Sequence, residues 1–121
     1  MVAKRSSLII GALAATLFAV ANAYAHAFLD HAEPGVGTTV ATAPAKIVLY
    51  FTGELEPAFS GCLLQDAEGR ELARSQASAE EDLTQLSITP PHLAAGSYRV
   101  LWSVVARDGH QTEGDYTFTL Q

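Results

Sequence analysis

The residues best suited to metal chemistry in this sequence are His26 and the run Asp108-Gly109-His110. A histidine that begins a chain offers its α-amine nitrogen and its ring Nδ1, which together close a chelate ring on one metal ion. The α-amine of a model peptide titrates at about 7.7–8.0, so a metal can displace its proton near neutral pH. In an extended segment, Asp108 and His110 would project to the same side. Nitrogen-rich tetragonal sites suit Cu(II), and we expect one Cu(II) per chain.

The leading residues decide whether His26 begins a chain. Residues 1–7 carry Lys4 and Arg5 and no acid, and residues 8–20 form an apolar stretch that is short for a bilayer span. Ala23-Tyr24-Ala25 then places small residues at the two positions that signal peptidase reads. We therefore predict a secretory signal peptide over residues 1–25 and a mature domain over residues 26–121. An uncleaved membrane anchor is the alternative.

Composition excludes several function classes. A chain of 121 residues allows one small domain. Its formal net charge of −6 disfavours nucleic-acid partners, because an acidic surface repels phosphate. One cysteine, Cys62, can form neither an internal disulfide nor a thiolate metal site, and we expect it to be buried on a strand.

The elements that must position the candidate ligands are short strands. Apolar residues alternate over 86–88, 98–104 and 116–120, which is the period of a half-buried strand. Residues 47–51 are continuously apolar, as in a strand buried on both faces, and 58–65 and 71–74 flank a turn at 66–69. We predict an all-β, immunoglobulin-like Greek-key β-sandwich of about seven strands. We expect residues 75–82 to form a loop or one helical turn. The site requires the first strand to begin beside the end of the 98–106 strand.

The remaining histidines and the Asp-Gly pair have simpler interpretations. Asp108-Gly109 between alternating strands is also a strong hairpin signal, which would leave His110 merely exposed. His31 lies five residues after His26, so on a regular strand it points to the opposite face. We expect His31 to be a surface residue, with an auxiliary ligand role as the alternative, and we expect His92 to be on the surface after Pro90-Pro91.

Four motifs together resemble the CopC-type periplasmic copper-binding proteins. They are His26-Ala27-x-Leu29 followed by Pro34, Gly96-x-Tyr98-x-Val100-x-Trp102, Val104-Val105-x-x-Asp108-Gly109-His110, and Gly114 followed by Phe118. The resemblance implies an immunoglobulin-like sandwich in the periplasm that binds Cu(II) through His26, Asp108 and His110. It also implies an inner-membrane copper transporter of the CopD type as partner.

The sequence also departs from relatives of this kind. Residues 26–121 contain no methionine, and Tyr50 stands where some relatives carry a histidine that helps bind Cu(I). The resemblance is therefore to the branch that binds Cu(II) only. Glu54 lies further from the preceding strand than the acid of relatives, which leaves open whether it assists the site. The positive charge of Arg107 beside the site would weaken metal binding somewhat.

These observations favour a monomeric, non-enzymatic copper carrier or buffer that serves copper homeostasis and resistance. A copper-dependent oxidase of the N-terminal-histidine type is one alternative, although Asp108 would fill the position where oxygen must bind. A metal-free adhesion or assembly sandwich is another, and it leaves the histidine at the predicted cleavage point unexplained.

Overall fold

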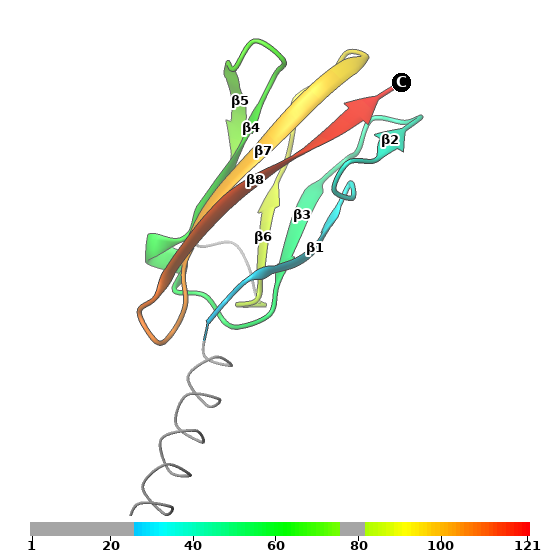
Figure 1. The fold of residues 1–121 in the computed structure, drawn as a ribbon. Helices are drawn as coiled ribbons and strands as arrows, with labels where there is room; N and C mark the ends of the chain where they lie inside the picture. The colour runs from blue at the N-terminus through cyan, green and yellow to red at the C-terminus, as the bar shows by residue number, and fades with distance from the viewer. Residues whose placement is uncertain (1–25, 76–81) are drawn as a thin grey trace, which may run out of the picture.

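The computed structural model describes residues 26–75 and 82–121, and these form two β-sheets packed face to face (Figure 1). The smaller sheet has the order β1 (Leu29–Glu33), β3 (Ile47–Phe51), β6 (Gln85–Ile88). The larger has the order β2 (Thr39–Val40), β8 (Gln111–Leu120), β7 (Gly96–Val105), β4 (Gly61–Gln65), β5 (Glu71–Arg74). All pairs are antiparallel except β2 with β8. The predicted all-β, immunoglobulin-like sandwich is confirmed; the described residues add one short strand, β2, to the seven expected.

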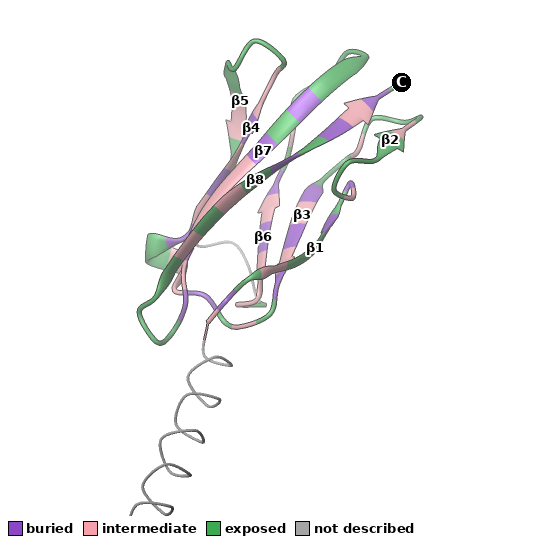
Figure 2. Cartoon of the chain, viewed as in Figure 1, coloured by how far each residue is buried: buried purple, intermediate pink, exposed green. Residues whose placement is uncertain are grey.

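The core lies between the two sheets, where alternate residues of each strand are buried (Figure 2). Along β7, Tyr98, Val100 and Val104 are buried, whereas Arg99 points to solvent. The largest fully buried side chains come from both sheets and from the segment after β3: Phe118, Ile47, Leu49, Leu55, Leu64, Ile88, Val100 and Val104. This burial is the main source of stability, because apolar area removed from water dominates the free energy of folding.

Two strands differ from expectation. In β3, Val48 and Tyr50 are only half-buried, so the strand is not buried on both faces. No further layer of described residues covers the outer face of the smaller sheet, which is usual for an antiparallel sandwich. The strand predicted over 58–65 begins only at Gly61, because a 3-10 turn, η1 (Pro57–Phe59), precedes it. Pro57 has the fixed φ that suits the first turn of a helix.

The sequence pattern predicts only part of the long β7–β8 hairpin. Strand β8 begins at Gln111, five residues before the predicted strand over 116–120. Residues 111–115 contain no large apolar side chain, so no alternation marks them. A Cβ atom at Gly114 would lie 2.6 Å from Cζ2 of Trp102, so the indole ring occupies the space that a side chain at position 114 would need.

Two expectations fall on residues that the structure does not describe. The predicted signal peptide, residues 1–25, lies outside the described residues, and so does the greater part of the 75–82 segment. Within residues 26–75 and 82–121, no helix is long and apolar enough to cross a bilayer.

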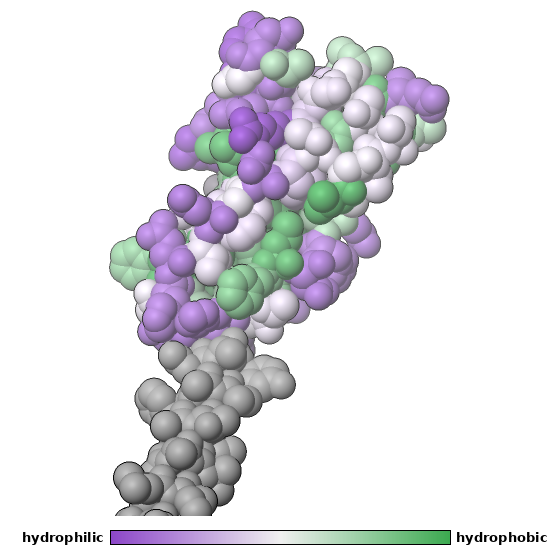
Figure 3. Space-filling model, in the orientation of Figure 1, coloured by the Kyte–Doolittle hydropathy of each residue, from purple (hydrophilic) through white to green (hydrophobic). Residues whose placement is uncertain are grey.

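The topology brings the segment before β1 and the turn between β7 and β8 together. Residues 26–28, which lead into β1, and the turn between β7 and β8 lie at the same end of the sandwich, the lower end in Figure 1. Hydrophilic residues gather over this turn on the face seen in Figure 3. The first strand thus begins beside the end of β7, as the candidate site requires.

Candidate metal centre

Asp108, Gly109 and His110 belong to the turn, residues 106–110, that joins β7 to β8. The backbone N of Gly109 donates to Ala106 O at 2.9 Å, and the backbone N of Ala106 donates to His110 O at 3.0 Å. Gly109 has a φ of 88°, a backbone conformation that residues with a Cβ atom rarely adopt. The hairpin interpretation of Asp-Gly is therefore correct, and the expectation of an extended segment here is wrong.

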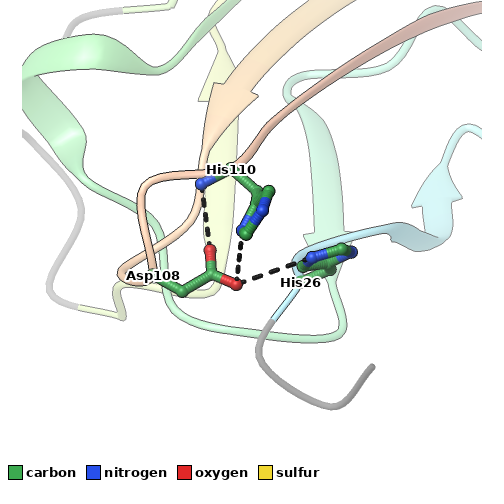
Figure 4. Close-up of side chains that lie close together, drawn as sticks. All are labelled: His26, Asp108 and His110. Carbon is green, nitrogen blue, oxygen red and sulfur yellow. Dashed lines mark hydrogen bonds and ion pairs between the residues drawn. The ribbon is translucent and has the colours of Figure 1, made fainter. Parts of the chain in front are cut away.

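The turn nevertheless brings Asp108 and His110 together (Figure 4). Oδ1 of Asp108 accepts a hydrogen bond from the backbone N of His110 at 3.0 Å. Oδ2 of the same carboxylate lies 2.9 Å from Nδ1 of His110. The tight turn, rather than strand alternation, is what directs the carboxylate and the imidazole to one place.

His26 approaches this pair from the segment that leads into β1 (Figure 4). Its Nε2 lies 3.7 Å from Oδ2 of Asp108, and its ring centroid lies 4.3 Å from that of His110. The hydroxyl of Thr112, two residues after His110, donates to the carbonyl of Ala27 at 2.7 Å. The segment that leads into β1 is thus joined directly to the hairpin.

The three side chains form a compact and partly shielded cluster. One ligand atom from each of His26, Asp108 and His110 lies within 4.8 Å of the other two. No other group of three or more His, Cys, Asp or Glu side chains comes together in this way within the described ranges. The side chains of His26 and Asp108 are 29% and 18% exposed, and that of His110 is 53% exposed.

Among the described residues, one nitrogen of the cluster has no hydrogen-bond partner. Nε2 of His26 is buried, and none of the residues in the described part of the chain lies within hydrogen-bonding distance of it. A buried polar atom without a partner is costly, and a bound metal is one way to satisfy it. The donor set, two imidazoles and a carboxylate, fits a borderline transition metal such as Cu(II).

Asp108 is held in the form that can bind a cation. The hydrogen bond from the backbone N of His110 lowers the pKa of the Asp108 carboxyl below its usual value, and partial burial opposes this effect. The ring of His110 and the charges of both histidines lower the pKa further. The group is therefore an ionised oxygen donor at neutral pH.

Arg107 and Glu54 lie beside the cluster and bind each other. Nε of Arg107 is 2.9 Å from Oε2 of Glu54, and the backbone N of Arg107 donates to Glu54 O at 3.3 Å. Glu54 thus contacts Arg107 rather than a candidate ligand. Its negative charge offsets the repulsion toward a metal ion that the sequence suggests for Arg107.

The other two histidines lie outside the cluster. The ring of His31 stacks on Tyr50 with centroids 4.2 Å apart, and its Nδ1 lies 2.7 Å from Oδ2 of Asp30. His92 is exposed in the segment between β6 and β7. Both therefore occupy the surface positions expected from the sequence. Cys62 is buried, also as expected.

Comparisons with known proteins agree on one family. The model of the CopC domain matches residues 29–121. Copper resistance protein C from Xanthomonas campestris pv. juglandis is 34% identical over 128 residues, which cover 100% of both chains. Protein YobA from Escherichia coli K12 is 33% identical over 112 residues, which cover 91% of this chain and 90% of that protein.

A solved structure agrees with these sequence matches. The crystal structure of CopC from Methylosinus trichosporium OB3b superposes with a TM-score of 0.73 and 36% identity. The match covers 79% of this chain and 94% of that one. The motifs around His26 and Asp108-Gly109-His110, the fold and these matches lead to the same conclusion: the chain belongs to the CopC domain family.

Proposed function

We propose that this protein binds one Cu(II) in the periplasm and acts as a copper carrier or buffer in copper homeostasis and resistance, without catalysis. The observation that carries the proposal is the convergence of His26, Asp108 and His110 at one end of the sandwich. The names of relatives, such as copper resistance protein C, support copper as the cargo. An inner-membrane transporter of the CopD type is the partner that we expect to receive the copper.

In this proposal, cleavage after Ala25 frees the α-amine of His26. The amine and the ring Nδ1 then chelate Cu(II), while His110 adds an imidazole nitrogen and Asp108 an oxygen. In the structure it is Nε2 of His26 that faces Asp108. Binding through Nδ1 therefore requires the imidazole to turn about its Cβ–Cγ bond. Nε2 has no hydrogen-bond partner within the described residues, so no hydrogen bond from this atom opposes such a rotation of the ring.

The oxidation state follows from the available ligand types. Cu(I) prefers soft thioether or thiolate ligands. Met1 is the one methionine of the sequence and precedes the predicted cleavage point, and Cys62 is buried in the core. The nitrogen and oxygen donors of the cluster favour Cu(II) instead.

The decisive experiment compares the mature protein, beginning at His26, with a version that carries one additional alanine before His26. The extension converts the amine into an amide and leaves every side chain in place. We expect one Cu(II) per chain in a nitrogen-rich tetragonal environment by electron paramagnetic resonance. Competition with a chelator should show that the extension costs at least as much affinity as His110→Ala.

Two histidines outside the cluster provide matched controls. His31→Ala and His92→Ala remove imidazoles at other surface positions and should leave Cu(II) affinity unchanged. Equal Cu(II) affinity of the extended and mature proteins would contradict the amine-anchored site.

A further inference from the structure

The segment that carries His26 is held by two threonine hydroxyls. Oγ1 of Thr52 accepts a hydrogen bond from the backbone N of Phe28 at 3.0 Å and donates to His26 O at 3.4 Å. Oγ1 of Thr112 donates to Ala27 O at 2.7 Å. Each of the residues 26–28 therefore has a backbone atom bound by one of these hydroxyls.

The two hydroxyls come from opposite sheets. Thr52 directly follows β3 of the smaller sheet, and Thr112 lies in β8 of the larger sheet. The backbone N of Thr52 also donates to Phe28 O at 2.8 Å. The segment is therefore fixed from both sides of the sandwich, and its position depends on both sheets.

The segment is also closely packed. Ala27 is only 1% exposed, so its carbonyl depends on protein donors such as Thr112 rather than on bulk water. A Cβ atom at Gly53 would lie 3.4 Å from His26 O and 3.8 Å from Cα of Ala27. The loop after β3 thus runs directly against the segment, with little space for it to move.

We propose that Thr52 and Thr112 are positioning residues for copper binding, a role that rests on the function proposed above. Neither hydroxyl contacts a candidate ligand atom of His26. Both fix the backbone just before β1, where the N-terminus of a cleaved chain would otherwise be poorly ordered. A metal ligand on a poorly ordered terminus must lose conformational freedom when it binds, and this loss weakens the affinity. The hydrogen bonds of Thr52 and Thr112 to residues 26–28, here called the clamp, remove that cost before copper binds.

The first test is Thr112→Val, which keeps the shape of the side chain and removes its hydroxyl. We expect the Kd for Cu(II) of the mature protein to rise about tenfold or more, the effect typical of residues that orient metal ligands. Thr112→Ser keeps a hydroxyl and should restore affinity. Thr117→Val is the matched control, because Thr117 is an exposed threonine on the same strand; it should leave the Kd unchanged.

Thr52→Val tests the same clamp from the other sheet and should also raise the Kd. The melting temperature of each metal-free variant, measured alongside, identifies any variant that is not folded at the temperature of the binding assay. If Thr112→Val and Thr52→Val are folded and bind Cu(II) as tightly as the mature wild type, the positioning role is overturned.

A double-mutant cycle separates positioning from a general loss of stability. Thr112→Val is combined with the alanine extension before His26, which already disables the chelate. A positioning residue should then cause little further loss of affinity. An equal loss in both backgrounds would overturn the positioning role while leaving the copper site intact. If the extension itself had no effect on the wild type, the proposed function would fail and this inference with it.

Discussion

Asp108 contacts both histidines of the cluster through a single carboxylate. Its Oδ1 accepts from the backbone of His110, and its Oδ2 faces the ring nitrogens of His110 and His26. A metal that took Oδ2 would compete with the ring of His110 for that oxygen. Oδ1 could continue to accept the backbone hydrogen bond, so the turn can keep its shape as copper enters or leaves.

The different contacts of Oδ1 and Oδ2 predict the effect of Asp108→Asn. The amide oxygen can still accept from the backbone N of His110, so the turn should persist, but the negative charge is lost. We expect Cu(II) affinity to fall about tenfold or more with little change in melting temperature. Titration of the mature protein in a competing chelator measures this.

Asp66→Asn is the control for that change. Asp66 also accepts backbone hydrogen bonds in a turn, from Glu68 and Arg70, but its turn joins β4 to β5. This variant should bind Cu(II) like the wild type. Wild-type affinity in Asp108→Asn would mean that the carboxylate is not a ligand.

At the scale of elements, the β7–β8 hairpin is the part of the fold on which the cluster depends most. Gly109 supplies the positive φ of its turn, and Gly69 supplies the same conformation, with φ of 83°, in the β4–β5 turn. The two turns make the same demand on the backbone, but only one carries candidate ligands. They therefore offer a direct comparison.

Gly109→Ala should lower both stability and Cu(II) affinity. Alanine at this φ costs about 1–2 kcal/mol, and relief of that strain would displace Asp108 from His110. Gly69→Ala should lower the free energy of unfolding, measured in urea, by a similar amount and keep the Cu(II) affinity of the wild type. Equal affinities of the two variants would show that the hairpin turn does not set the ligand geometry.

The hairpin also shows what the sequence could and could not predict. The residues Asp108 and His110 were identifiable from their types and spacing, although they converge through a turn rather than an extended strand. The contacts of Thr52 and Thr112 were not predictable. Their partners lie 24 and 85 residues away in the chain, and a threonine that binds a distant carbonyl leaves no pattern in the sequence.

In the whole molecule, the candidate ligands lie outside the core, although Ala27 beside His26 belongs to it. The core fills the space between the sheets, whereas the cluster lies at one end of the sandwich (Figures 2 and 4). Folding should therefore depend on the core and not on copper, and the domain should have its full structure before the metal binds.

Leu64→Ala tests this separation. Leu64 is 0% exposed, and truncation of its side chain to alanine should lower the free energy of unfolding, measured in urea, by about 2–5 kcal/mol. Cu(II) affinity should stay unchanged under conditions in which the variant is folded. Leu63→Ala, at the neighbouring half-buried position, should cost less. A large loss of affinity in folded Leu64→Ala would show that the core and the site are coupled.

Carboxyl groups across the molecule make folding sensitive to strong acid. Three aspartates accept hydrogen bonds that lower their pKa values: Asp66 from the backbone N of Arg70, Asp82 from the hydroxyl of Thr84, and Asp108 from the backbone N of His110. Such groups stabilise the fold above the pKa of the unfolded chain, and this contribution is lost as pH falls through the lower folded value. The metal-free protein should therefore lose stability only below about pH 4.

Copper affinity should fall at a higher pH than that at which the fold is lost. Cu(II) competes with protons for imidazole nitrogens, and model imidazoles titrate at about 6.5. The Kd for Cu(II) should therefore rise steeply as pH falls from about 8 to about 5, while the lowered carboxyl pKa values still keep the fold intact. Titration of the mature protein against a competing chelator at each pH measures the Kd, and near-ultraviolet circular dichroism of the same samples follows the fold. If the Kd for Cu(II) stayed constant between about pH 8 and pH 5, the cluster of His26, Asp108 and His110 would not be the copper site.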